Sequence, residues 1–531
     1  MFYRRLKNTL YLILVLLMMN VICTSTVQSQ PSSKNPPEPS GALIVALNEM
    51  SDVFDPLRVN NNHKYYLSIV FENLVGADRN GQVKPSLSLA EKWERTPDAK
   101  TWTFILRKGV RFHNGEELTA ADVKFSIERV MSPNSTMTYA SMIRDLVDRV
   151  EVVDPYTARF HLRKPVPDLH RMLASESYEG FILPKKYIEE KGDVYFGLHP
   201  VGTGPYKVVE IVGGSQIRLE SAYRNHWLHG PARYKNLVYK LVPEELTRIG
   251  MIKTGEADVA RINADRVEGV KRSGFKVIED PAAHIPFIVF AEQWRKEYPV
   301  SNPKVRQALV LAVNREEILK HIFYGMGRLS GSITAAKNAL GDAGLPFYPY
   351  DPQKAKRLLN EAGYPKGFKI KLHSFPTEMF PSLPRTMETI AAYFQQVGVQ
   401  AEIIPYADYI SFRPKMVAGE LEGGLHGNDS MARNNPLRAM YLWYNSSSRY
   451  TQIKSPEVDE WINKAQSTLD EGERKALIQK IDKYNHENYT FLFALERSIP
   501  YVLSKKVEPW DMGTLVMDIN LEKVLMWNSP K

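Results

Sequence analysis

Apolar positions along the chain follow two different periods, and together they predict an alternation of strands and helices. A continuous apolar run over 42–47 predicts a buried strand, and the alternating stretch Thr101–Arg107 predicts a strand with one buried face. After a turn at Asn114–Gly115, residues 119–122 (TAAD) resemble a helix capping box, and an apolar stripe with helical spacing follows as far as Pro133. These segments indicate a mixed α/β chain.

The second half of the chain shows the same alternation with clearer boundaries. Asn302-Pro303 and Asp351-Pro352 each join a capping residue to a proline in the first turn, so we expect helices to begin there. A strand over 368–372, a helix closed by Gly398 and a strand over 399–404 then form a predicted βαβ unit. Because a crossover helix joins parallel strands, we expect these two strands to be parallel. The predicted fold class is α/β, with helices covering a sheet.

The N-terminus has the pattern of an export signal. Three basic residues within the first seven precede an apolar run over 10–19, which is shorter than the roughly 20 residues that a membrane-spanning helix needs. We expect residues 1–29 to be a signal peptide, cleaved after Ser29. No other stretch is apolar enough to span a bilayer, so we expect an exported, periplasmic protein.

Residues 30–41 are rich in proline and serine and carry no apolar period, so we expect a disordered tether. Cys23 lies where a lipoprotein would carry its acylated cysteine. The residue before it is Ile22, which is large and branched, whereas lipoprotein signals have a small residue there. Plain cleavage is therefore preferred over a lipid anchor at Cys23.

Length, charge and cysteine content narrow the possibilities further. A chain of 531 residues is long enough for two to four domains. The single cysteine excludes an internal disulfide framework and a four-cysteine zinc site. The formal net charge of +9 would permit a nucleic-acid partner, but we expect none for an exported protein.

Motifs of catalysis and of cofactor binding are missing from the sequence. It contains no G-x-S-x-G elbow, no H-E-x-x-H helix and no G-x-x-x-x-G-K loop, so we expect neither enzymatic activity nor a cofactor. Residues 202–205 (GTGP) are interpreted as a turn because the proline removes a donor that a phosphate site would need. His226 and His229 have the spacing of metal ligands, but Gly230-Pro231 indicates a loop and no third ligand is evident. We therefore predict no metal site.

Several ordered strings resemble the periplasmic solute-binding proteins of ABC importers, of the large oligopeptide, dipeptide and nickel-binding type. The most specific are residues 85–93 (PSLSLAEKW) and 101–115 (TWTFILRKGVRFHNG). Shorter strings follow in the matching order, namely 202–206 (GTGPY), 253–258 (KTGEAD), 305–308 (VRQA), 351–352 (DP) and 361–365 (EAGYP). The resemblance extends from about Ala42 to the C-terminus.

The resemblance implies a type II periplasmic binding-protein fold, in which two hinged lobes are joined by crossover strands. The first lobe would comprise 42–80, 190–285 and 495–531, with an inserted subdomain at 81–189. The second lobe would comprise 286–494. A solute that touches both lobes only in the closed form would shift the hinge equilibrium towards closure.

The resemblance also implies a function and partners. The chain would bind a peptide or a peptide-like solute, act as a monomer, and present its closed form to permease subunits that work with separate ATPase subunits. In peptide-binding members an aspartate after a glycine-rich strand of the second lobe holds the peptide's amino group, and the matching stretch here is 423–430 (GGLHGNDS). Asp429 is the candidate for that role.

Other residues are implied as pocket candidates by the same resemblance. Tyr409 resembles an aromatic that lines the pocket, Arg433 has the guanidinium geometry of a carboxylate clamp, and Trp443 is a candidate wall. Asn428 and His426 belong to the stretch around Asp429. Trp102 and His113, in the strongest strings, are expected to build the inserted subdomain rather than to touch a solute.

Three alternatives stay open. His426 stands where relatives have a residue like tryptophan, which favours a receptor for a non-peptide solute such as an opine, a sugar conjugate or a metal chelate. A secreted hydrolase or an export chaperone is the alternative from a different class. The sequence leaves open the ligand and its affinity, the permease partner and the lipidation of Cys23.

Overall fold

A computed structural model gives the fold of the chain. It describes residues 38–58, 64–78, 81–135, 137, 139–174, 178–334, 344–377, 380–430, 436–512 and 521–526. The expected signal peptide, Cys23 and most of the expected tether lie outside the described residues. The described residues from Pro39 onward form one unit.

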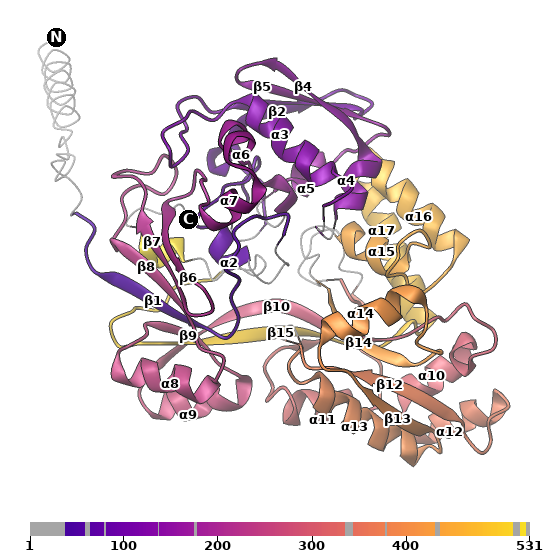
Figure 1. The fold of residues 1–531 in the computed structure, drawn as a ribbon. Helices are drawn as coiled ribbons and strands as arrows, with labels where there is room; N and C mark the ends of the chain where they lie inside the picture. The colour runs from indigo at the N-terminus through magenta and orange to yellow at the C-terminus, as the bar shows by residue number, and fades with distance from the viewer. Residues whose placement is uncertain are drawn as a thin grey trace, which may run out of the picture. The chain divides into compact units, whose positions relative to one another are not determined.

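A mixed sheet of 11 strands runs through this unit (Figure 1). Its order is β13-β12-β14-β10-β15-β9-β1-β8-β7-β6, and β11 pairs with β15 at its side. In that order the strands are β13 (Gln400–Pro405), β12 (Lys369–Ser374), β14 (Leu425–Ser430), β10 (Lys276–Phe290), β15 (Phe491–Leu503), β9 (Val259–Arg261), β1 (Ala42–Leu47), β8 (Asn236–Leu241), β7 (Gln216–Ser221), β6 (Tyr206–Val212) and β11 (Arg328–Leu329).

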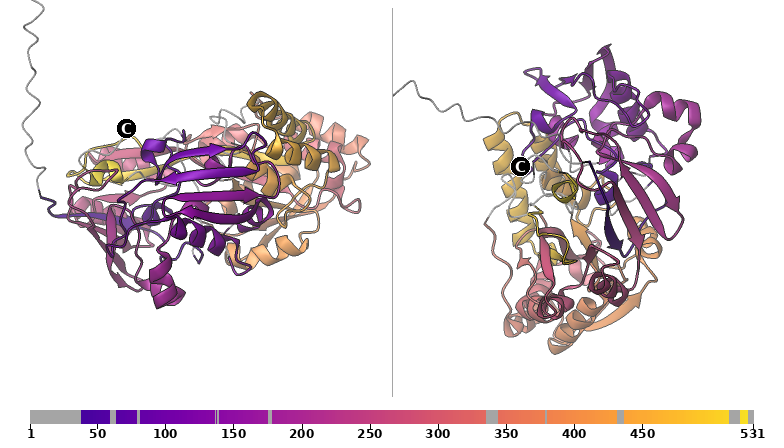
Figure 2. Two further views of the ribbon diagram at one scale, coloured as in Figure 1. Left: turned by 90° about the horizontal axis from the view of Figure 1, so that it is seen from above. Right: turned by 90° about the vertical axis from the view of Figure 1, so that its left-hand side faces the viewer.

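A second, antiparallel sheet has four strands in the order β2-β3-β5-β4. These are β2 (Ala90–Arg95), β3 (Thr101–Leu106), β5 (Thr157–Leu162) and β4 (Val147–Asp154). The buried Trp102 indole on β3 donates to the carbonyl of Val166 at 2.8 Å, which ties the sheet to the loop beyond it. In the left view of Figure 2 the strands of this sheet lie in the foreground.

The helices of the first 300 residues are short. They are α2 (Lys64–Leu67), α3 (Ala120–Met131), α4 (Ala140–Leu146), α5 (Leu169–Met172), α6 (Lys185–Lys191), α7 (Asp193–Leu198), α8 (Glu245–Thr254) and α9 (Val267–Arg272). The later helices are α10 (Pro303–Leu311), α11 (Arg315–His321), α12 (Pro352–Glu361), α13 (Leu383–Gln396), α14 (Tyr409–Ala418), α15 (Pro436–Tyr444), α16 (Pro456–Ser467), α17 (Glu471–Glu487) and α18 (Glu522–Leu525). Among the described residues, no helix combines the length and the apolar character needed to cross a membrane.

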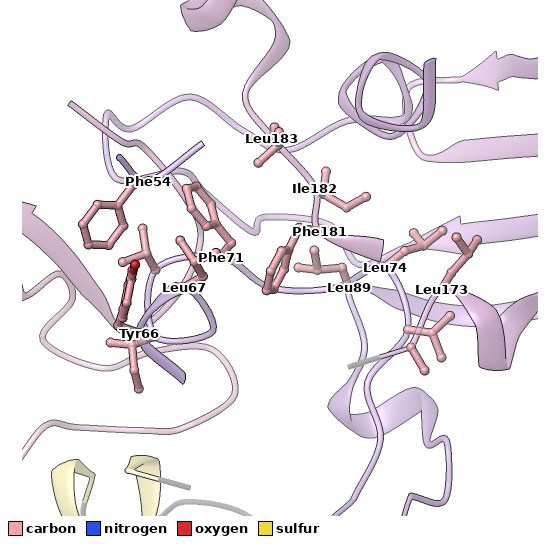
Figure 3. Packing of buried hydrophobic residues seen from close by; sticks show 14 of the residues in the cluster. Phe54, Tyr66, Leu67, Phe71, Leu74, Leu89, Leu173, Phe181, Ile182 and Leu183 are labelled. Carbon is pink, nitrogen blue, oxygen red and sulfur yellow. The ribbon is translucent and has the colours of Figure 1, made fainter. Parts of the chain in front are cut away.

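Buried apolar side chains form two large clusters, which we call the first core and the second core. The first core takes its residues from 43–278 and again from 499–526, and Figure 3 shows its packing around Phe71. The second core takes its residues from 285–495. A smaller cluster packs α8 and α9 beside β9. Each core is closed by its own side chains, so the chain has two separate hydrophobic centres.

One pair of long strands passes between the two cores. β10 and β15 pair antiparallel from Lys276 opposite Leu503 to Val289 opposite Phe491, with an irregularity between Asp280 and His284. Ile278 at one end of β10 belongs to the first core, whereas Phe287 further along belongs to the second. The ribbon is visible in Figure 1 as two long strands below the centre. Both cores are therefore anchored on the same backbone ladder.

Local predictions from the sequence are confirmed where the signals were strong. The strands predicted at 42–47 and at Thr101–Arg107 are β1 and β3. In the predicted capping box the Asp122 carboxylate accepts from the Thr119 amide at 2.8 Å, and α3 follows. The predicted βαβ unit is β12-α13-β13, and its two strands pair directly and in parallel.

The ordered backbone begins slightly earlier than the sequence predicted. The amide of Ser40 donates to the carbonyl of Arg233 at 3.1 Å, and the amide of Asn236 donates to the carbonyl of Gly41 at 3.1 Å. Ser40 and Gly41 belong to the stretch expected to be a disordered tether. Its proline and serine content hid this pairing, because backbone hydrogen bonds to a distant strand leave no local pattern.

A buried arginine holds the second core to the β10–β15 ribbon. Arg315, at the start of α11, is 3% exposed, and its guanidinium donates twice to the carbonyl of Leu492 on β15, at 2.7 and 2.9 Å. It also donates to the carbonyls of Val310 and Val313 at 2.7 and 2.9 Å. Burial lowers the pKa of Arg315 to about 9, so the group stays charged at neutral pH.

We predict that Arg315→Ala lowers the free energy of unfolding by at least about 3 kcal/mol, because several buried carbonyls lose a charged donor together. Urea denaturation at neutral pH measures this. The control is Arg149→Ala, whose side chain is 60% exposed and forms an ion pair with the neighbouring Asp148. Equal stability of the two variants would show that the Arg315 contacts contribute nothing.

Candidate functional site

The stretch that the sequence selected for binding folds as β14, between β12 and β10 in the second core. Successive side chains of a strand point to opposite faces. His426 and Asn428 therefore share one face of β14, and Gly427 and Asp429 share the other. The two faces meet different helices, so these neighbours in sequence do not form one surface.

His426 lies in the interior. It is 0% exposed, and its ring is tilted against Phe412 of α14 with 5.4 Å between ring centroids. Burial lowers the pKa of His426 to about 4 because the charged imidazolium loses its hydration. A neutral, fully covered ring acts as a packing group in this position.

Asn428 and Tyr409 lie side by side on the α14 face. Burial raises the pKa of the Tyr409 hydroxyl to about 12, and the nearby Asn428 side chain counteracts part of this rise. Tyr409 is the first residue of α14, and Asp408 caps this helix by accepting from the Ser411 amide at 2.8 Å. The fold thus brings together two of the predicted site residues, which are 19 positions apart in the sequence.

Asp429 lies on the opposite face. At Gly427, which shares this face, an added Cβ would meet the Leu383 side chain of α13 at 2.3 Å. Asp429 is 6% exposed and pairs in register with Pro286 of β10. On β15, Arg497 pairs with His284 of β10, two positions from Pro286. By the same alternation Arg497 lies on the same face of the sheet as Asp429, and β10 runs between their two strands.

A cavity of about 230 Å³ opens beside Arg497. Its lining comes from β9 and the residues after it, from the segment after α11, from the start of α13 and from β15, and includes Arg261, Arg385, Arg497, Asn263, Asp265 and Tyr324. Three guanidinium groups against one carboxylate give this lining a positive balance. The chemistry suits a molecule that carries a carboxylate, because guanidinium groups bind carboxylates with two parallel hydrogen bonds.

Trp443 and Arg433 complete the predicted set. Trp443, on α15, is 3% exposed and meets Phe287 of β10 edge to face, with 5.0 Å between ring centroids. Phe287 is paired with Asn428, so the indole belongs to the α14 face of the sheet. Arg433 lies outside the described residues.

Helix α15, which follows β14, brings the second core into contact with the first (Figure 1). Arg438 of α15 lies 3.4 Å from the carboxylate of Glu179, with side chains 10% and 2% exposed. Its guanidinium also stacks on the ring of Tyr139 at 3.6 Å from the centroid. Sequence reasoning missed this contact, because nothing near Arg438 in the sequence points to residues almost 300 positions away.

Further polar contacts join these two regions. Arg474 of α17 lies 4.0 Å from Asp168, and Lys164 donates to Gln466 of α16 at 3.3 Å. A small cavity of about 20 Å³, roughly the size of one water molecule, remains between α15 and α5. Surfaces of this kind separate more readily than apolar ones, because water can satisfy the groups that part.

Comparison with known proteins gives a consistent picture. A family model described as bacterial extracellular solute-binding proteins, family 5 Middle, matches residues 84–451. The dipeptide-binding protein of Escherichia coli (strain K12) is 29% identical over 472 residues, which cover 80% of this chain and 84% of that protein. The heme-binding protein A of Haemophilus influenzae is 30% identical over 430 residues, covering 75% and 76%.

A solved structure shares the fold. The periplasmic binding protein DppA of Helicobacter pylori, in complex with the peptide STSA, matches with a TM-score of 0.78 and 25% sequence identity. The match covers 92% of this chain and 99% of that one. The predicted type II periplasmic binding-protein fold is therefore confirmed.

The burial of His426 leads to a prediction about pH. The unfolded chain takes up a proton on this imidazole below about pH 6.5, whereas the folded protein resists until about pH 4, so stability is lost as the pH falls through this window. Between pH 7 and pH 5 we expect wild type to lose about 2 kcal/mol more unfolding free energy than His426→Gln. Urea denaturation at both pH values checks this.

Other buried histidines are common to both proteins and cancel in the comparison. The control is His321→Gln, at a side chain that is 59% exposed, and it should keep the pH dependence of wild type. If wild type and His426→Gln respond identically to pH, the imidazole is not held neutral by the fold.

Proposed function

The chain belongs to the family 5 bacterial extracellular solute-binding proteins, and from this premise we propose that it is the receptor of an ABC importer for peptides or peptide-like solutes. It captures the solute between its two cores and delivers it unaltered to permease subunits in the membrane, whose transport is driven by separate ATPase subunits. It acts as an exported, periplasmic monomer without catalysis and without a cofactor for this task.

One observation carries the proposal, namely that two closed cores are joined by the β10–β15 ribbon and meet at a polar contact around Arg438. Separating the cores at that contact leaves the interior of each core closed, and water can hydrate the charged groups that separate. A solute that binds both sides gains its extra contacts only in the closed form, and this difference shifts the equilibrium towards closure. The permease can then read the closed form as the loaded one.

The two cores support a division of the chain into lobes. We propose a first lobe of 42–80, 190–285 and 495–531 and an inserted subdomain of 81–189. We propose 286–494 as the second lobe. The limits of the second core, Ile285 and Leu495, support this division. With these boundaries the chain crosses from one proposed lobe to the other twice, once in β10 and once in β15. The β10–β15 ribbon is therefore the proposed hinge.

Asp429 is the proposed partner of the solute's amino group, because an ammonium ion brought out of water needs a nearby carboxylate. Its 6% exposure and its place on the face that also carries Arg497 support an oppositely charged pair around a zwitterionic solute. Tyr409 and Asn428 are proposed to line the other face of β14. Arg433 stays a proposed carboxylate clamp.

Two of the proposed pocket residues have little surface to offer. Trp443 and His426 are 3% and 0% exposed. Any influence they have on binding would be transmitted through Phe287 and Phe412, on which they pack.

A metal chelate such as haem is the second candidate solute. It is favoured by the relative of 30% identity that is named for haem binding. The positively lined cavity beside Arg497 would also suit the propionate groups of such a ligand.

The solute itself is best identified by denaturing the purified protein and analysing the released small molecules by mass spectrometry. We expect peptides, followed by stoichiometric rebinding of the same peptides and a rise in melting temperature. The protein is also incubated with a peptide library to detect cleavage. Release of haem or an opine would replace the solute class, and peptide products would replace the receptor by a hydrolase.

The assignment of Asp429 is tested with Asp429→Asn, which keeps the shape and removes the charge. We expect the dissociation constant of a bound peptide to rise by about 100-fold, of the order of 3 kcal/mol, because the ammonium ion loses its buried partner. Isothermal titration calorimetry measures this. An Nα-acetylated peptide should bind equally weakly to wild type and to the variant.

Asp408→Asn is the matched control, since asparagine also caps a helix and Asp408 lies on the exposed start of α14. Asn428→Ala asks whether the other face of β14 binds the solute. If Asn428→Ala abolishes binding while Asp429→Asn leaves it intact, the α14 face is the binding face and the role of Asp429 is refuted.

A further inference from the structure

The structure brings a third residue to the His226 and His229 pair. Glu72 follows α2 in the first core, and the histidines lie in the loop between β7 and β8. Each of the three residues can offer one ligand atom so that the three atoms lie within 4.8 Å of one another. The third ligand that the sequence lacked comes from a segment more than 150 positions away.

Two of the three residues, Glu72 and His226, are buried, and His229 is partly exposed. The side chains of His226 and Glu72 are 1% and 9% exposed, and His226 Nε2 lies 3.8 Å from Glu72 Oε1. Two of the cluster's polar atoms, Glu72 Oε1 and His229 Nδ1, are buried and make no hydrogen bond within the described part of the chain. Buried polar atoms without partners are rare in native proteins, and a bound ion is one of the explanations.

We propose that Glu72, His226 and His229 form a binding site for a divalent transition-metal ion, of which Zn²⁺ is the representative. Two imidazoles and one carboxylate are a known zinc ligand set, and such sites leave a fourth position for water. Imidazole also suits Ni²⁺, Co²⁺ and Cu²⁺, whereas Mg²⁺ and Ca²⁺ prefer oxygen ligands. The site therefore selects against the common alkaline-earth ions.

The surroundings hold these ligands in place. The Trp227 indole donates to Glu72 Oε2 at 3.0 Å, which leaves Oε1 as the ligand atom and orients the carboxylate. The backbones of His226 and Gly230 exchange hydrogen bonds of 2.9 and 3.0 Å, which closes the loop that carries both imidazoles. The two rings stack with 5.1 Å between centroids.

Metal binding requires the His226 imidazole to change its hydrogen-bond partners and the position of its proton. His226 Nε2 lies 2.9 Å from the carbonyl of Thr203, while His226 Nδ1 accepts from the amides of Leu228 and His229 at 3.2 Å. An ion bound at Nε2 displaces the proton that Nε2 now directs at the Thr203 carbonyl. The proton passes to Nδ1, which then releases the amides of Leu228 and His229 to other acceptors, and zinc–nitrogen bonds of about 2 Å draw the three ligands closer.

The site has a structural consequence within the first core. It links the segment after α2 to the loop after β7, two parts of the chain that are far apart in sequence. An ion that binds the folded protein and not the unfolded chain stabilises the fold. The proposal does not depend on the solute or on β14, because none of its ligands belongs to the second core.

The test uses the full protein after treatment with a chelator, and titrates it with Zn²⁺ in competition with a chromophoric chelator. We expect one tight site, no comparable site for Mg²⁺, and a higher melting temperature with Zn²⁺. His229→Asn should weaken the binding of Zn²⁺ by at least about 10- to 100-fold, the loss that follows even from removal of a residue supporting a ligand. Glu72→Gln should do the same.

The control is His321→Asn, since His321 and Glu317 form an exposed pair 2.9 Å apart that can collect zinc weakly. Unchanged affinity in His229→Asn and Glu72→Gln, or a loss confined to His321→Asn, overturns the proposal. Wild-type protein loaded with Co²⁺ gives a second test, which uses no variant and so does not depend on whether a variant folds. Intense visible bands of four-coordinate cobalt are expected, and the weak spectrum of six-coordinate cobalt would overturn the site.

Discussion

The antiparallel pairing of β10 with β15 is the constraint on which the rest of the molecule depends. Each strand has one end in the first hydrophobic core and the other end in the second, so a single backbone ladder fixes how the two centres are connected. β14 pairs with β10 at one end and β9 pairs with β15 at the other, so each half of the sheet grows from this ladder. The irregularity at Asp280–His284 interrupts the ladder between the cores. A missing stretch of ladder bonds is where a ribbon bends with the least loss of hydrogen bonding.

Local sequence signals predicted the elements of the second half well. The capping pairs Asn302-Pro303 and Asp351-Pro352 start α10 and α12, and in each case the cap side chain accepts an amide of the first turn. A cap, a stripe and a closing glycine act over a few residues, so one sequence suffices to read them. The lobes required the resemblance to a family, because contacts between distant segments leave no period in the sequence.

The candidate site shows the same limit in more detail. Its stretch could be selected from the sequence, but the division of β14 into two faces depends on a register with β10 that the sequence does not display. His426 was expected near the solute, and its ring is fully buried against Phe412. Only part of the cluster of Glu72 with His226 and His229 could be predicted from the sequence. The two histidines are close in sequence, whereas the glutamate is far from them. Arg438 left no signal at all.

The contact at Arg438 explains why weak interactions between the cores are an advantage for a receptor. Any bond between the cores favours the closed form whether or not a solute is present. The closed form reports a bound solute only if it is much more populated with the solute than without it. A strong apolar contact in place of the Arg438–Glu179 pair would close the protein without cargo and would compete with loaded copies for the permease. The pairs with Glu179, at 3.4 Å, and with Asp168, at 4.0 Å, are polar contacts whose charges water can hydrate again when they separate. In the proposed receptor, the interior of each core stabilises that core by itself, and the solute supplies the closing energy.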